Sequence, residues 1–242
     1  VSLGAMLGSW LWIPPLSEGR SRQPLEELRR LGHPRYRTAL LDLGAACLLV
    51  GCSLLLAGSN QFWLSSLGMS DMAGGFANTV YQLSAALVGM GLGGCVNGAK
   101  GVQLVLKYQH AGLALGMVGV AALCSRLQPD PAGGWMLPDG CLPVVLLLMG
   151  VLGATLLGML PFLMLRAEAS LQPLPENVVS GLLYFGAMLV TSSLTRVCTA
   201  IPPLASLRLV AVLLALDILY FCVAGLCVDS RAVVVGELAH AA

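Results

Sequence analysis

The stretch LPVVLLLMGVLGATLLGMLPFLML, residues 142–165, contains no charged side chain. A helix needs about 20 residues to cross the roughly 30 Å hydrocarbon core of a bilayer. Within that core every backbone N–H and C=O group must find its hydrogen-bond partner inside the protein, and a helix satisfies these groups within a single segment. This stretch therefore predicts a membrane-spanning helix.

The composition of the whole chain supports the same conclusion. Of its 242 residues, 57% are hydrophobic and only 10% are charged, which lies outside the range of soluble domains. The apolar residues form continuous runs, whereas a membrane β-barrel needs alternation. With 13 Lys and Arg against 12 Asp and Glu, the chain has no basic surface for a phosphate backbone, which excludes a nucleic-acid partner. The expected surroundings are a lipid bilayer.

Further long intervals without charge, or nearly so, separate the charged residues along the chain. Each can hold about one membrane-spanning helix. We predict these helices near residues 40–58, 78–97, 108–124, 142–165, 178–196 and 207–228. The expected fold is an all-α membrane protein with a six-helix transmembrane bundle over residues 39–228.

The segments outside this bundle differ in character. Residues 1–13 are apolar but too short to span a bilayer and lack basic residues at their start, so we interpret them as the end of a truncated transmembrane helix. Residues 14–38 contain six Arg and are predicted to be a cytoplasmic basic linker. Residues 229–242 then form a cytoplasmic tail.

The distribution of Lys and Arg gives the orientation. If the linker is cytoplasmic, counting through six spans places ten basic residues on that side and three on the other, as the positive-inside rule requires. Beyond the linker, the cytoplasmic ones are Lys100, Lys107, Arg166 and Arg231, and the opposite ones are Arg126, Arg196 and Arg208. We expect a multi-pass integral protein of the plasma membrane or of an organelle membrane.

Cysteine and histidine give no sign of catalysis. The eight cysteines include no CxxC pair, and those inside the predicted spans are interpreted as small hydrophobic residues. His33, His110 and His240 are scattered along the chain, so no metal cluster or catalytic triad is proposed. We expect no enzyme activity, no cofactor and no specific disulfide.

Small residues recur at intervals of about four within several predicted spans. Examples are Gly112 with Gly116, the series Gly150, Ala154 and Gly158, and the glycine-rich run over residues 89–98. This spacing places small side chains on one helix face, which is typical of close helix packing. Helices that slide during transport would show the same spacing.

Asp217 lies near the middle of the last predicted span. An ionisable group there costs at least about 2.5–3.5 kcal/mol on insertion scales, so its side chain should face protein or water. As a functional group it would bind a cation, a substrate ammonium group or a coupling proton, and as a structural group it would pair with a neighbour. Asp42, by contrast, is interpreted as an interfacial partner of Arg37.

Uncharged polar side chains also fall within or beside the spans. They are Asn60, Gln61, Tyr81, Gln82 and Tyr184. Such groups tend to face the interior of a bundle, either lining a cavity or forming hydrogen bonds of about 0.6 kcal/mol between helices. The sequence leaves both possibilities open.

Gly93, Asn97 and Lys100 lie at the end of the second predicted span and just after it. Together with the six spans behind a basic linker, they resemble the cytoplasmic loop between helices eight and nine of the major facilitator superfamily, in which an acidic residue follows a Gly by four positions. Asn97 replaces that acid, so no ion pair would form there. The resemblance implies the C-terminal six-helix half of a transporter, with an N-terminal six-helix half as its partner.

A second motif, QPLPENVVSGLL, occupies residues 172–183. It is similar to the Pro-x-x-Glu-Gly-x-x-Ser-Gly-Leu-Leu stretch of the feline leukaemia virus subgroup C receptor-related family, whose members move haem, choline, ethanolamine or related small organic molecules. Asn177 replaces the usual Gly. The matching positions are Pro173, Glu176, Ser180, Gly181, Leu182 and Leu183.

The polar positions within the spans and the two resemblances together imply roles for individual residues. The substrate-binding residues expected are Gln82, Tyr184, Met188 and Asp217, and the structural or gating residues are Asn97, Lys100, Pro173, Glu176 and Gly181. Met188 stands where choline-transporting relatives have a ligand-facing Gln, and it donates no hydrogen bond.

The function expected is transport of a small organic solute by alternating access, with this chain as one part of the transporter. Two alternatives remain. One is a seven-span receptor-like protein, if residues 1–13 belong to a complete span. The other is a truncated product that does not transport and acts only by associating with full-length partners.

Overall fold

The computed structural model describes residues 37–240, apart from 94–95, 97, 131–133 and 172–173. The helices are α3 (Arg37–Ser66), α4 (Asp71–Gly93), α5 (Gly98–Cys124), α6 (Leu142–Leu156), α7 (Leu160–Ser170), α8 (Glu176–Ala200) and α9 (Pro203–His240). A 3₁₀ turn, η2 (Leu157–Met159), joins α6 to α7, and two short strands, β1 (Gln128–Asp130) and β2 (Gly134–Met136), lie between α5 and α6.

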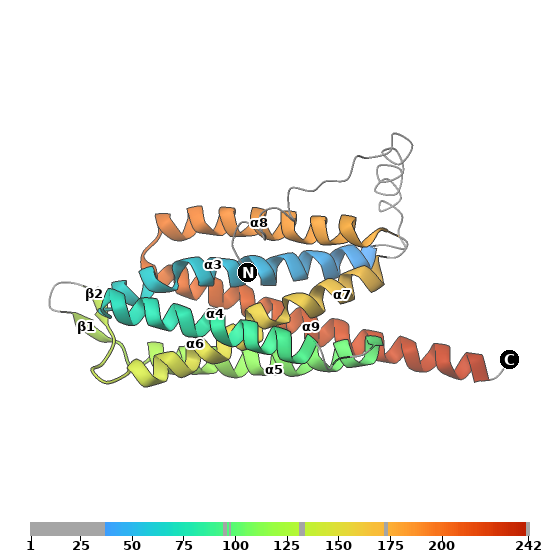
Figure 1. The fold of residues 1–242 in the computed structure, drawn as a ribbon, viewed down its shortest axis with the longest axis horizontal. Coiled ribbons are helices and arrows are strands. Elements are labelled where there is room, and N and C mark those ends of the chain that lie inside the picture. The colour runs from blue at the N-terminus through green and yellow to red at the C-terminus, as the bar shows by residue number, and fades with distance from the viewer. Residues whose placement is uncertain (1–36, 94–95, 97, 131–133, 172–173, 241–242) are drawn as a thin grey trace, which may run out of the picture.

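The helices lie side by side and run in alternate directions along the chain, with α6, η2 and α7 together making one pass (Figure 1). The most extensive contacts are between α4 and α6 and between α3 and α8. Tyr81 of α4 and Leu183 of α8 are fully buried in these contacts. The result is a bundle with a continuous apolar core, as expected for helices that must bury faces against one another.

Five segments of the described chain are long and apolar enough to cross a membrane. They are Arg37–Ser66, Lys100–Cys124, Leu142–Ser170, Glu176–Ala200 and Pro203–Val223. The predicted all-α, multi-pass membrane architecture is therefore confirmed at this level. The second predicted span, now α4, falls short of the others because it contains Asn78, Thr79 and Gln82.

Helix α4 begins at Asp71, earlier than the predicted start near residue 78. The hydroxyl of Ser70 accepts a hydrogen bond of 3.3 Å from the backbone N–H of Ala73. Asp71 also places a negative charge at the positive end of the helix dipole. A polar cap and an acid thus start this helix before its apolar part begins.

The predicted helix over residues 142–165 is interrupted at η2. Pro161 has no backbone N–H and cannot donate to the carbonyl of Leu157 four residues earlier. That carbonyl instead accepts from the N–H of Leu160 in a 3₁₀ turn. The break follows from one proline, and the absence of charge over residues 142–165 gives no indication of it.

The antiparallel pair β1–β2 was not predicted from the sequence. Directly after β2, the N–H of Leu137 donates to the carbonyl of Leu67 at 3.0 Å. Leu137 also packs with Leu64, Ala77 and Val145 in a small apolar cluster. The loop between α5 and α6 is thereby attached to the end of α3.

Glycines allow the closest helix contacts. Added Cβ atoms at Gly112 and Gly116 of α5 would lie 2.7 Å from Thr155 and 3.0 Å from Leu152, respectively, both on α6. The predicted packing role is confirmed for these two glycines. It is wrong for Gly91, which has nothing within 4 Å of an added Cβ atom, because this part of α4 faces away from its neighbours.

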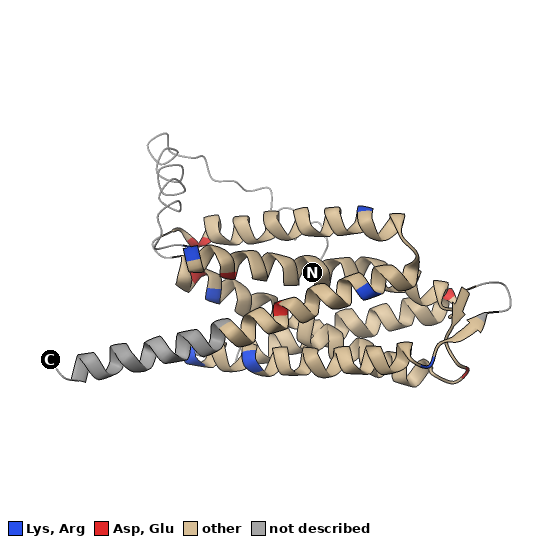
Figure 2. Ribbon diagram, turned by 180° about the vertical axis from the view of Figure 1, so that it is seen from behind, with Lys and Arg blue, Asp and Glu red and all other residues tan. Residues whose placement is uncertain are grey.

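Charged residues lie mostly toward the two ends of the bundle (Figure 2). Because the helices alternate in direction, the start of α5 with Lys100 and the end of α7 with Arg166 share an end with Arg37. Arg126, which follows α5, and Arg196, near the end of α8, lie at the other end. This arrangement agrees with the grouping of basic residues expected from the sequence.

Candidate functional site

Three of the four predicted substrate-binding residues lie on the outside of the bundle. Gln82 of α4 is exposed, as are Tyr184 and Met188 of α8, with exposed fractions of 40% and 56% for the last two. Asp217 of α9, in contrast, is buried with 4% exposure. The structure therefore does not bring the four residues together into one site.

Three of the five predicted structural or gating residues are described, and they lie near one end of the bundle. Lys100 is exposed in the first turn of α5, and Glu176 is the exposed first residue of α8. Gly181 is also exposed, with open space around it. Asn97 and Pro173 lie outside the described residues.

One residue of the Pro-x-x-Glu motif links two helices. The hydroxyl of Ser180 on α8 donates a hydrogen bond of 3.2 Å to Oε1 of Glu168 on α7. The motif residue Pro175 is extended and precedes the first residue of α8. These contacts describe how the chain turns from one helix into the next.

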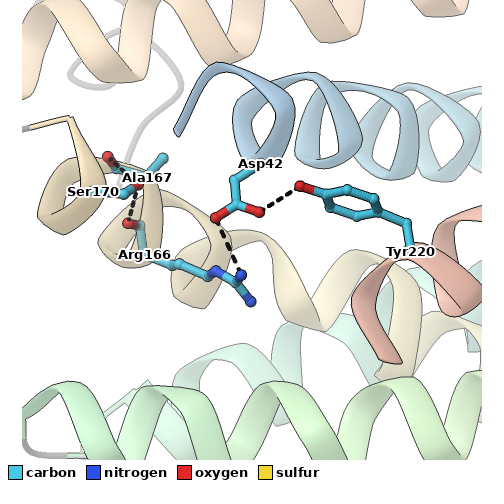
Figure 3. A network of polar contacts seen from close by, with 5 residues as sticks. All are labelled: Asp42, Arg166, Ala167, Ser170 and Tyr220. Carbon is cyan, nitrogen blue, oxygen red and sulfur yellow. Dashed lines mark hydrogen bonds and ion pairs between the residues drawn. The ribbon is translucent and has the colours of Figure 1, made fainter. Parts of the chain in front are cut away.

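A network of polar contacts joins α3, α7 and α9 near the same end (Figure 3). The carboxylate of Asp42 accepts a hydrogen bond of 2.7 Å from the Tyr220 hydroxyl through Oδ1. Its other oxygen, Oδ2, lies 3.2 Å from the Arg166 guanidinium. The expected pairing of Asp42 with Arg37 is therefore wrong, because the fold brings Arg166 to Asp42 from a distant part of the sequence.

An aromatic side chain joins this network to a second one. The Phe221 ring stacks on the His110 ring, with centroids 3.8 Å apart and planes inclined by 7°. The Arg166 guanidinium carbon lies 5.1 Å from the centre of the same Phe221 ring, in a cation–π contact. Arg166 is thus held by an acid and by an aromatic ring.

His110 and Asp217 form a buried pair between α5 and α9. Nε2 of His110 lies 3.5 Å from Oδ2 of Asp217, and the two side chains are 5% and 3% exposed. Nδ1 of His110 lies 2.8 Å from the carbonyl oxygen of Leu106. Asp217 therefore lies beside a basic side chain, but its Oδ2 makes no hydrogen bond to a described residue.

The three histidines are far apart in the chain, so the sequence offered no reason to assign a role to His110. The sequence nevertheless contained a signal for the pair. Helix α5 ends and helix α9 begins at the same end of the bundle, and His110 and Asp217 lie at similar distances from that end. Residues at matching depths in antiparallel helices can meet. Only the packing of α5 on α9 determines that these two do.

Both networks line a single cavity. Its walls include Asp42, His110, Arg166, Asp217 and Tyr220, and its volume is about 30 Å³. This volume holds about two water molecules. It is too small for haem or choline.

A second cavity, of about 60 Å³, is almost entirely apolar. It is lined by Asn60 and Trp63 of α3 among many aliphatic residues, and Asn60 is 1% exposed. Both polar atoms of the Asn60 side chain lack a hydrogen-bond partner within the described residues. The cavity offers little polar surface with which to orient a solute.

Tyr81 and Gln61 line neither of these two cavities, although the sequence left a cavity lining possible for both. Tyr81 is fully buried, and its hydroxyl lies 3.1 Å from the hydroxyl of Ser53. It also donates to the Ser53 carbonyl at 3.2 Å, which makes it a hydrogen-bonded link between α4 and α3. Gln61 is exposed at the end of α3.

Within the described part of the chain, no group of three His, Cys, Asp or Glu side chains is placed to hold a metal ion. Six cysteines in this part are free thiols, namely Cys47, Cys52, Cys124, Cys141, Cys198 and Cys222.

Comparison with known proteins adds no further identification. No family model matches the chain, and no curated protein or solved structure is significantly similar to it.

Proposed function

We propose that this chain is the C-terminal six-helix half of a transporter of the major facilitator type. In this proposal it pairs with an N-terminal six-helix half and moves a small organic solute such as haem, choline, ethanolamine or a related molecule by alternating access. The observation that carries the proposal is the outward position of Gln82 and Tyr184 on two apolar helices.

Gln82 and Tyr184 have polar groups that lipid cannot satisfy. Neither side chain makes a hydrogen bond to another described residue, although both belong to helices of the bundle. Polar side chains within a membrane face protein or water, because an unsatisfied polar group in hydrocarbon costs several kcal/mol. A second helical unit with a water-filled pathway between the halves would supply these partners.

The exposed side of α8 has the properties of a pathway wall. Residues spaced by three or four positions form one exposed stripe along it, made of Tyr184, Met188, Ser192, Thr195 and Thr199. The three Ser and Thr hydroxyls donate to carbonyls of their own helix, so they leave the wall mildly polar without requiring another partner. Tyr184 and Met188 are the members placed to contact a solute.

The size of the enclosed cavities favours this exposed surface over the interior as the solute site. The cavity around Asp217 holds about two waters, and the apolar cavity has about twice its volume, 60 Å³ against 30 Å³. A solute of the proposed class needs far more room. The substrate roles of Gln82, Tyr184 and Met188 are therefore retained, whereas Asp217 is not proposed to touch the solute.

The buried and half-buried ionisable residues also support transport. Replacing a buried ion pair by well-packed hydrophobic residues is often neutral or stabilising, so charges kept inside an apolar bundle need a further reason. Intramembrane ionisable residues commonly mark ion or substrate pathways. Here Asp42, Arg166, His110 and Asp217 occupy one small cavity among four helices.

The proposal is tested by uptake of labelled choline, ethanolamine and haem into proteoliposomes that contain this chain together with its N-terminal half. We expect uptake of at least one solute. Tyr184→Phe and Gln82→Leu should each reduce it about tenfold, which corresponds to the loss of one hydrogen bond worth about 1.4 kcal/mol.

Tyr108→Phe is the matched control, because Tyr108 is an exposed tyrosine on α5 at 71% exposure and has no proposed role. It should leave uptake unchanged. Absence of uptake for all three solutes, or an equal effect of Tyr108→Phe and Tyr184→Phe, would contradict the proposal.

A further inference from the structure

The hydrogen bond from His110 to the backbone fixes the position of one ring proton. Nδ1 lies 2.8 Å from the carbonyl oxygen of Leu106, which can only accept a hydrogen bond. Nδ1 must therefore be the donor and carry a hydrogen. In a neutral ring the other nitrogen, Nε2, then has a lone pair and no hydrogen.

That second nitrogen faces a carboxylate. Nε2 lies 3.5 Å from Oδ2 of Asp217, and water has little access to either side chain. A nitrogen lone pair opposite an ionised carboxylate is repulsive, whereas one added proton makes the contact attractive. The proton can reside on the imidazole, giving an ion pair, or on the carboxyl group, giving a neutral hydrogen bond.

From this geometry we infer that His110 and Asp217 together form a binding site for one transferable proton. Binding forms one N–H or O–H bond at the pair and takes the proton from hydronium, leaving water. Release reverses the step. If the proposed transport function holds, this proton is the coupling ion of the transporter, and that role rests on the proposed function.

In the arrangement of helices that the structure shows, the charges around the pair favour the bound proton. Helix α3 contributes Asp42 to the cavity and Cys52 close to Asp217, α7 contributes Arg166, and α9 contributes Tyr220. Helix α8, which also packs on α9, contributes no described residue to the cavity lining.

Arg166 balances Asp42, with the two atoms 3.2 Å apart. The carboxylate of Asp217 is therefore balanced only when the pair holds its proton. Losing this proton would leave one negative charge in a cavity that holds about two waters. Release therefore requires α5 and α9 to separate or the cavity to open, which is how a conformational change can be coupled to a proton.

The same cavity provides a route for the proton from one side. Asp42 and Arg166 are 22% and 23% exposed, whereas His110 and Asp217 are nearly inaccessible. The Asp42 side of the cavity is therefore the side nearest to water, and it is the side from which the proton would enter when the cavity opens. According to the distribution of basic residues, this is the cytoplasmic end.

The proton site itself is tested by nitrogen NMR of histidine-labelled chain in lipid nanodiscs. His33→Gln and His240→Gln leave His110 as the sole signal. At neutral pH we expect the Nε2 resonance to report a proton that binds or hydrogen-bonds to this nitrogen. In Asp217→Asn the ring should lose that proton and become the neutral form protonated at Nδ1.

Asp71→Asn is the matched control, because Asp71 is an exposed acid at the other end of the bundle. It should leave the His110 spectrum unchanged. Identical Nε2 signals in the wild type and in Asp217→Asn, with both proteins folded by circular dichroism, would overturn the proton site.

The coupling role is tested separately in the uptake assay. An inward pH gradient should raise solute accumulation in the wild type, and Asp217→Asn should keep uptake down the solute gradient but lose its response to pH. Wild-type uptake that ignores the gradient would overturn coupling and leave transport standing. If no solute enters, coupling falls with the proposed function, and the NMR result still decides whether the pair binds a proton.

Discussion

Asp217 and Asp42 illustrate how the surroundings of one residue decide its role. Both are acids near or within predicted spans, and the sequence allowed either a structural or a functional interpretation for Asp217. The structure gives each a partner, the buried His110 for Asp217 and the half-buried Arg166 for Asp42. Each pair offsets part of the cost of removing charge from water, and breaking such a pair leaves an uncompensated charge.

Asp42→Asn tests this compensation at the scale of a single residue. The amide can still accept from the Tyr220 hydroxyl, but Arg166 loses its negative partner. We expect the free energy of unfolding to fall by about 1–3 kcal/mol, measured by unfolding with sodium dodecyl sulfate and circular dichroism. The double variant with Arg166→Gln should lose less free energy of unfolding than the two single variants lose together. Strict additivity of the two losses would show that the pair contributes nothing.

At the scale of helices, small residues and prolines decide where elements begin, break and meet. Pro161 interrupts the pass formed by α6 and α7, and Ser70 with Asp71 starts α4. Helices α4 and α6 approach each other closely at Gly153, where an added Cβ atom would overlap the carbonyl of Tyr81. This contact explains why these two helices pack so extensively.

Gly153→Ala and Gly75→Ala should therefore change stability in opposite directions. Both glycines are helical, but Gly75 has nothing within 4 Å of an added Cβ atom. Alanine at position 75 should stabilise the protein by up to about 1 kcal/mol through helix propensity. Alanine at position 153 should destabilise it by about 1–3 kcal/mol through overpacking. The midpoints of thermal unfolding give the comparison, and a stabilising Gly153→Ala would show that α4 and α6 are not in close contact.

At the scale of the whole molecule, alternating helix directions bring the charged residues to two ends of one apolar bundle (Figure 2). Lys100 and Arg166 share one end although they are far apart in the sequence, and Arg126 lies at the other. Five of the helical passes are apolar enough to cross a membrane by length and composition. The bundle therefore has two polar ends separated by an apolar middle.

Accessibility labelling tests the orientation that follows. Lys100→Cys and Arg126→Cys, each made after replacing the eight native cysteines with alanine, are both at exposed positions. An impermeant maleimide added outside intact cells should label position 126 and reach position 100 only after the membrane is permeabilised. Labelling of both from the same side would contradict the predicted topology and, with it, the proposed half-transporter.

The sequence alone determined the class of the molecule and the approximate helices, because membrane insertion depends on local hydrophobicity over about 20 residues. It also marked Asp217 as a residue that needs a partner. It missed the strand pair, the break at Pro161 and the early start of α4, since these depend on single turns and caps rather than on hydrophobicity.

Only the tertiary structure decided which side chains meet. His110 and Asp217, like Asp42 and Arg166, lie on different helices, and their contacts depend on how each helix is rotated about its axis and on which neighbour it packs. Those rotations are set by many small packing contacts summed over the whole bundle. No local pattern in the chain records that sum, which is why the polar networks emerged only once the helices were packed together.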